Sequence, residues 1–122
     1  MSVNTSPIRL RDTPAELQAK LNLTGPRFDN FKNFARRAHN EYIQTHPTSR
    51  WANVNVVWTA LPEQERLETS RIMYDLCKAA SLFPAGYPQS RIKEGIEARL
   101  HQVRRTWQQG KRENQRQHAD DD

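Results

Sequence analysis

Residues 26–45 read PRFDNFKNFARRAHNEYIQT, and this stretch decides the fold class. Its apolar side chains recur at three- and four-residue intervals, which predicts one amphipathic helix from about Pro26 to Thr45. Pro47 ends the pattern, because the residue before a proline is disfavoured in the helical conformation. The stripe that would face a core consists of Phe28, Phe31, Phe34 or Ala35, Ala38 and Tyr42.

The opposite face of this predicted helix is polar and basic, with Arg27, Lys32, Arg36 and Arg37 beside several amides. The whole chain has 122 residues and a net charge of +5, and residues 84–119 contain eight Lys or Arg against three Glu. A basic excess of this kind favours a polyanionic partner, most often nucleic acid. The alternative for these side chains is an ordinary solvated helix surface.

A short helix is predicted before this stretch. Thr13-Pro14-Ala15-Glu16 combines an N-cap residue, a proline in the first turn and a glutamate that can close a capping box. The helix should cover residues 14–22, with Leu17 and Leu21 on one face. It is too short to be stable alone, so we expect it to dock on the main core.

Three helices are predicted after Pro47. Trp51, Val54 and Trp58 follow the helical period between residues 48 and 60, although the valines there also suit a strand. A further helix should begin at Pro62 and run to about Leu82. After a turn-rich linker over residues 83–88, a last helix should run from Ser90 to about Gln109 and end at Gly110.

The sequence therefore predicts an all-α protein, and its length allows one compact domain. We expect an N-terminal arm with a short helix over residues 1–24 and a three-helix domain over residues 25–83. A basic amphipathic helix should follow over residues 84–110. Residues 111–122 have almost no apolar content and should form a disordered tail.

Catalytic chemistry has little support in the sequence. The four histidines, His39, His46, His101 and His118, show no zinc-binding spacing, and there is no Gly-rich phosphate loop. Cys77 is the only cysteine and lies on an apolar helical face, where a thiol usually packs as a small hydrophobic group. We therefore expect no enzyme activity, no metal and no cofactor.

The sequence also argues against a membrane partner. No stretch approaches 18 consecutive apolar residues, and residues 1–10 lack the apolar block of a signal peptide. The chain is expected to be intracellular.

Residues 26–83 resemble a divergent HMG box, the L-shaped three-helix domain that binds and bends DNA through the minor groove. The segment 28–34, FDNFKNF, is similar to the aromatic opening of the box's first helix, and His46-Pro47 is similar to its end. The most specific similarity is 58–66, WTALPEQER, which resembles the bridge between the second and third helices. The fungal mating-type α-box is another family that the chain resembles.

The resemblance implies a DNA-binding protein, nuclear if eukaryotic, with shape- and charge-driven binding and an architectural or transcriptional role. This chain departs from the box at Lys32, where the family carries an apolar wedge, and in the interval of 11 residues from Pro47 to Trp58. DNA is favoured over RNA as the partner. The DNA-binding residues so implied are Arg27, Asn30, Lys32, Asn33, Arg36, Arg37 and Arg50.

Two further sets of residues are candidates for DNA binding. Phe28 and Trp51 lie at predicted helix starts, where full burial is hardest, so either could remain exposed as a wedge between bases. Arg99, Arg104 and Arg105 of the last helix could clamp the DNA backbone.

A helical protein-interaction module is the alternative function. The last helix presents an apolar seam that could pair with a partner or with a second copy of the chain, giving a homodimer through residues 91–107. The seam consists of Ile92, Ile96, Leu100, Val103 and Trp107.

Overall fold

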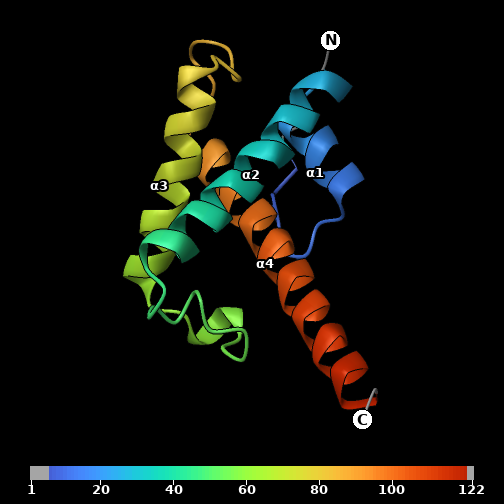
Figure 1. The fold of residues 1–122 in the computed structure, drawn as a ribbon. Coiled ribbons are helices and arrows are strands. Elements are labelled where there is room, and N and C mark those ends of the chain that lie inside the picture. The colour runs from blue at the N-terminus through green and yellow to red at the C-terminus, as the bar shows by residue number, and fades with distance from the viewer. Residues whose placement is uncertain (1–5, 121–122) are drawn as a thin grey trace.

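The computed structural model describes residues 6–120, with side chains for residues 6–113. Within that part the fold is entirely helical, which confirms the predicted all-α class. Figure 1 shows the arrangement, in which α4 crosses α2 and continues well beyond the other helices. The elements are α1 (Pro14–Leu21), α2 (Gly25–Thr45), the 3-10 turn η1 (Trp58–Ala60), α3 (Glu63–Ala79) and α4 (Gln89–Asp120).

The first two helices begin where their capping residues predict. The Thr13 hydroxyl accepts from the backbone N–H of Glu16 at 3.2 Å, and the Glu16 carboxylate accepts from the Thr13 N–H at 3.1 Å, which completes a capping box. The Thr24 hydroxyl accepts from the Arg27 N–H at 3.4 Å at the start of α2. Between them, Asn22 ends α1 in the left-handed conformation.

The helix predicted over residues 48–60 is wrong. The segment consists of turns, and only Trp58–Ala60 forms the short helix η1. The guanidinium of Arg104 donates to the carbonyls of Arg50, Trp51, Asn53 and Val56, and so supplies hydrogen bonds that a helix would otherwise have to make. Hydrogen bonds from a side chain about fifty residues away therefore take the place of those that a local helix would make.

The predicted end of the last helix is also wrong. α4 continues through Gly110 to Asp120, where the sequence predicted a disordered tail over residues 111–122; residues 121 and 122 lie outside the described part. A glycine inside a helix costs only about 1 kcal/mol relative to alanine. Gln109 and Lys111 beside it are good helix formers, and they allow the helix to pass through this position.

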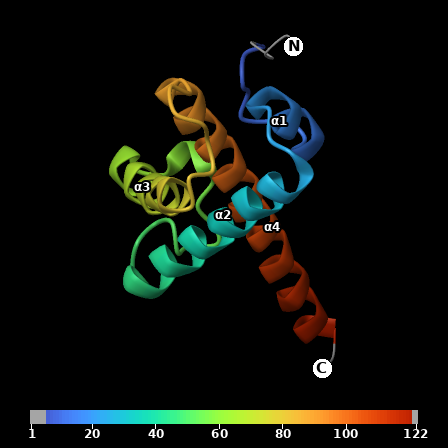
Figure 2. The same ribbon diagram turned by 90° about the horizontal axis from the view of Figure 1, so that it is seen from above.

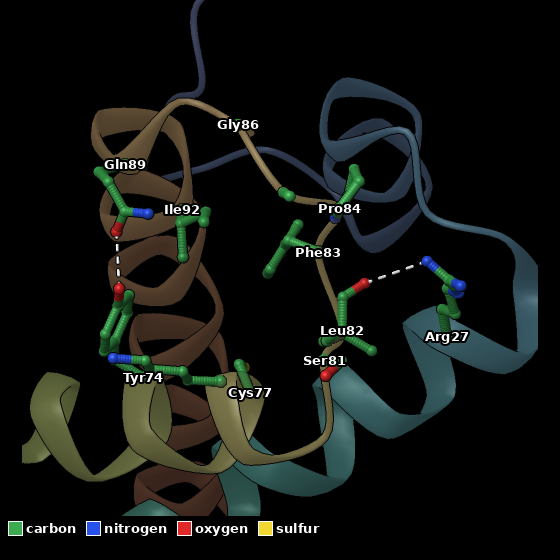
Figure 3. A pocket seen from close by; sticks show the side chains of 12 residues that line it. Arg27, Tyr74, Cys77, Ser81, Leu82, Phe83, Pro84, Gly86, Gln89 and Ile92 are labelled. Atoms are coloured by element: carbon green, nitrogen blue, oxygen red, sulfur yellow. Dashed lines mark hydrogen bonds between the residues drawn. The ribbon is translucent and has the colours of Figure 1, made fainter.

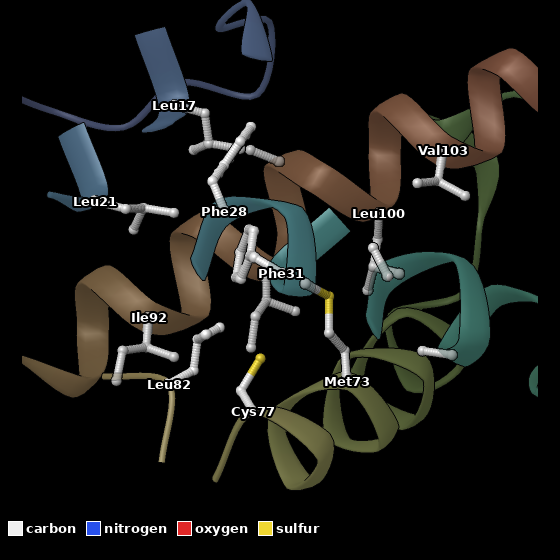
Figure 4. Packing of buried hydrophobic residues seen from close by; sticks show 14 of the residues in the cluster. Leu17, Leu21, Phe28, Phe31, Met73, Cys77, Leu82, Ile92, Leu100 and Val103 are labelled. Atoms are coloured by element: carbon white, nitrogen blue, oxygen red, sulfur yellow. The ribbon is translucent and has the colours of Figure 1, made fainter. Parts of the chain in front are cut away.

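The apolar seam of α4 is part of the core. Ile92, Ile96, Leu100 and Val103 are all buried against α1, α2 and α3, and Trp107 is half-buried beside His39. Figure 2 shows α4 running under α2 with α1 and α3 on either side, and Figure 4 shows its side chains meeting those of the other helices. The homodimer and the protein-interaction module were both predicted to use this seam. Because the seam is buried within the chain, it is not available to a partner or to a second copy.

Candidate nucleic-acid interface

The outer face of α2 is open to solvent. Asn30, Asn33, Arg36 and Arg37 are all exposed on the side of the helix that faces away from the core. Within the described side chains, neither Arg36 nor Arg37 forms an ion pair. Two guanidinium groups and two amides are therefore free to meet a ligand on one helical face.

Two other predicted contact residues on α2 are already engaged. The Lys32 ammonium pairs with the Asp29 carboxylate at 3.3 Å and lies 5.4 Å from the centroid of the Phe28 ring. The Arg27 guanidinium donates to the Leu82 carbonyl at 3.3 Å. Both cations remain near the surface, but each has a partner within the chain.

Arg50 lies away from this face, in the loop that follows α2. Its side chain is exposed, its backbone N–H donates to the Glu65 carboxylate at 3.3 Å, and its carbonyl accepts from Arg104. Arg50 therefore does not share the outer face of α2 with the other residues that were predicted to bind DNA.

The two predicted base wedges are buried, so that assignment is wrong. Phe28 is 3% exposed and lies close to Leu17 of α1, as Figure 4 shows. Trp51 is fully buried, and its indole N–H donates to Nδ1 of His39 at 3.0 Å. Each side chain is covered by a residue of another element, Leu17 of α1 or His39 of α2, and a prediction from helix starts alone does not include such contacts.

Arg104 cannot clamp a DNA backbone, because it is 1% exposed. Its guanidinium donates to four loop carbonyls at 2.7 to 3.3 Å, and burial lowers its pKa to about 10. Arg104 is therefore a structural residue that holds the loop over residues 50–56. The sequence offered no signal for this role beyond the position of Arg104 beside Val103, between Leu100 and Trp107, on the apolar side of the helix.

The other two predicted clamp residues are nearer to solvent. Arg105 is exposed, whereas Arg99 is half-buried and donates to the Gln102 side chain at 2.9 Å. Burial, followed by the nearby charge of Arg36, lowers the pKa of Arg99. Arg99 therefore lies near Arg36, where α4 packs against α2.

A second group of basic side chains lies on another part of the surface, and of its members only Arg105 was predicted from the sequence to bind DNA. Arg11, His101, Arg105 and Arg112 line a cavity of about 380 Å³ between α4, the segment before α1 and the loop that ends at Trp58. We call it the Arg11 groove. His101, Arg105 and Arg112 are four and seven residues apart, a helical spacing that could have revealed their shared face. The position of Arg11 depends on the fold alone.

A cavity of about 490 Å³ lies under the turn between α3 and α4 and is drawn in Figure 3. Cys77 lines it, and burial raises the pKa of that thiol to about 12, so it is protonated at neutral pH. Two polar groups that line the cavity are paired within the chain, since Arg27 donates to the Leu82 carbonyl and Tyr74 donates to Gln89 at 2.7 Å. The Cys77 thiol is therefore not an activated nucleophile.

Among residues 6–113, no three His, Cys, Asp or Glu side chains lie close enough together to hold a metal ion. No described helix is long and apolar enough to cross a membrane.

The clearest surface feature of the molecule is thus its cationic side chains, on the outer face of α2 and in the Arg11 groove. Comparison with known proteins adds no assignment, since no family model, no curated protein and no solved structure matches the chain.

Proposed function

We propose that this protein binds DNA through the outer face of α2, with phosphate contacts supplying most of the affinity. The observation that carries the proposal is that Arg36 and Arg37 are exposed beside Asn30 and Asn33, with no ion pair among the described side chains. Unpaired guanidinium groups on one rigid element suit the regularly spaced phosphates of a duplex.

The roles of the four side chains follow from their chemistry. Arg36 and Arg37 would contact phosphate oxygens, and Arg99 on α4 would extend the contact past Arg36. Asn30 and Asn33 would lie nearer the base edges, where an amide can both donate and accept. Intercalation has no part in the proposal, because Phe28 and Trp51 belong to the core.

Because the chain resembles the HMG box, a domain that bends DNA, bent DNA and four-way junctions should be tested beside linear duplex. It rests on residues 28–34, 46–47 and 58–66. Within the same proposal the protein acts in the nucleus if its source is eukaryotic, in an architectural or transcriptional role, and DNA is preferred to RNA.

A gel-shift assay with matched variants tests the proposal. The variant Arg36→Gln/Arg37→Gln should weaken binding to every DNA shape by at least tenfold, since each lost charged contact accounts for roughly a factor of ten. Arg71→Gln is the control, because Arg71 is also exposed but lies on α3. Equal loss in the two variants, or no shift of the wild-type protein at low salt, would contradict the proposal.

A further inference from the structure

The Arg11 groove has a floor and two walls. The floor is one face of α4, on which His101, Arg105, Gln108 and Arg112 are separated by four, three and four residues. One wall is the segment that carries Arg11. The other is the loop that ends in η1, and there the ring of Trp58 meets that of His101 edge to face, with centroids 5.1 Å apart. A neighbouring cavity of about 410 Å³ shares Arg11, His101, Arg105 and Gln109 with it.

The wall that carries Arg11 is tied to the helices around it. The carbonyl of Asp12 accepts a hydrogen bond from the Gln102 side chain of α4. The carboxylate of Asp12 is buried and pairs with Lys20 of α1 at 2.9 Å, and it also accepts from the backbone N–H of Arg9 at 2.9 Å. Arg11 therefore stands on a fixed turn at the rim of the groove.

The opposite wall is fixed by the floor itself. Gln108 donates to the carbonyls of Val54 and Val56 at 3.0 and 2.9 Å, and Arg104 donates to the Val56 carbonyl at 2.7 Å. Side chains of α4 thus hold both walls, so the groove is built before any ligand arrives. Preorganised sites of this kind lose little conformational entropy on binding.

The charge in the groove is uncompensated. Arg11, Arg105 and Arg112 are exposed and form no ion pair among the described side chains, and no carboxylate lines the cavity beside Trp58. Asp12, which lines the neighbouring cavity, is paired with Lys20. Burial and then the charges of Arg105, Arg11 and Arg104 lower the pKa of His101. Such a concentration of like charge is unfavourable in the empty protein and is typical of an anion site.

We propose that the Arg11 groove binds an anion that carries two linked phosphate groups, held by the guanidinium groups of Arg11, Arg105 and Arg112. Guanidinium forks bind phosphate oxygens in pairs, and three of them exceed what a single phosphate needs. His101 would donate a further hydrogen bond from the floor. None of these residues lies on α2, so the inference stands independently of the proposed function.

Phosphate groups in this arrangement have two sources, a free diphosphate compound and consecutive phosphates of a nucleic-acid strand. The experiment is a titration at low salt with inorganic pyrophosphate and, separately, with a short single-stranded oligothymidylate. Calorimetry gives the affinity, and the ring proton signals of His101 report occupancy. His46 serves as the internal reference, because it lies at the end of α2 away from the groove.

Pyrophosphate should shift the His101 signals and leave those of His46 unchanged. The variant Arg11→Gln/Arg105→Gln should bind at least tenfold more weakly, whereas Arg36→Gln/Arg37→Gln should bind as the wild type does. Both substituted groove residues are exposed, so the variant should fold. If oligothymidylate produces the same His101 shift, the phosphates are those of a strand; if only pyrophosphate does, the ligand is a free diphosphate. Either result supports the site.

Two results would overturn it. One is the absence of any His101 shift with either probe, and the other is equal affinity in the wild type and the groove variant. A failure of the DNA gel shift with pyrophosphate binding intact would refute the proposed function and leave this site standing.

Discussion

The guanidinium carbon of Arg104 lies 5.5 Å from the centroid of the Trp51 ring, and its Nε donates to the Trp51 carbonyl at 3.2 Å. One buried arginine thus holds both the ring and the backbone of a residue in a loop far away in the sequence. The same group reaches the carbonyls of Arg50, Asn53 and Val56. The structure of residues 50–56 therefore depends on this side chain together with Gln108, which donates to the Val54 and Val56 carbonyls.

Replacing Arg104 with lysine should destabilise the protein by about 3 kcal/mol, because one ammonium group cannot reach four separate carbonyls and buried acceptors would lose their partners. Arg105→Lys changes an exposed neighbour and should have almost no effect. Urea unfolding followed by tryptophan fluorescence measures the free energy of unfolding of the two variants. Equal stability of the two variants would show that the loop does not need the guanidinium.

Stability should fall as the pH drops from about 6.5 to about 4, because burial and then the charge of Arg104 lower the pKa of His39 to about 4. The unfolded chain takes up a proton on this histidine near its ordinary pKa of 6.5, whereas the folded protein does not until about pH 4. The free energy of unfolding should fall by on the order of 3 kcal/mol between these two pH values.

Unfolding curves recorded through that pH range check the expectation. His39→Gln can still accept the indole N–H of Trp51 but does not titrate, so its stability should change much less with pH. If His39→Gln keeps the wild-type pH profile, another group causes the pH dependence.

Gly95→Ala should destabilise the protein by about 1 kcal/mol. A Cβ at this position would lie 2.8 Å from Cδ2 of the buried Leu21, and crowding of this kind costs about 1–3 kcal/mol against a gain in helix propensity of about 1 kcal/mol. Gly110→Ala has open space around it and should instead stabilise the helix. The midpoint of thermal unfolding should therefore fall in Gly95→Ala and rise in Gly110→Ala. If both midpoints move in the same direction, α1 and α4 are not in close contact at Gly95.

The thiol of Cys77 should react with a thiol reagent far more slowly in the folded protein than in denaturant. The side chain is 2% exposed, and burial holds its pKa near 12, so almost no thiolate is present at neutral pH. Stopped-flow absorbance with an aromatic disulfide measures the rate. Fast labelling of the native protein would contradict the packing of α3.

The parts of the fold that could be predicted from the sequence depend on local signals. Thr13, Glu16 and Thr24 mark the helix starts by their own backbone contacts, and the apolar period of residues 26–45 defines α2. Pro47 marks its end in the same local way, since α2 stops at Thr45.

The parts that could not be predicted depend on contacts between distant residues. The loop over residues 50–56 is determined by Arg104 and Gln108, and the burial of Trp51 by His39 and Arg104. The same limit applies to the candidate sites. The period of α2 placed Arg36 and Arg37 on its outer face, whereas the meeting of Arg11 with α4 required the folded chain.

The salt dependence of DNA binding tests the central claim most directly. The dissociation constant of wild-type protein and of Arg36→Gln/Arg37→Gln should be measured by fluorescence anisotropy over a range of salt concentrations. Each phosphate contact contributes about 0.9 to the slope of log affinity against log salt, so the variant should lose roughly 2 from the wild-type slope. Identical slopes for the two proteins would contradict the claim that α2 binds the DNA backbone.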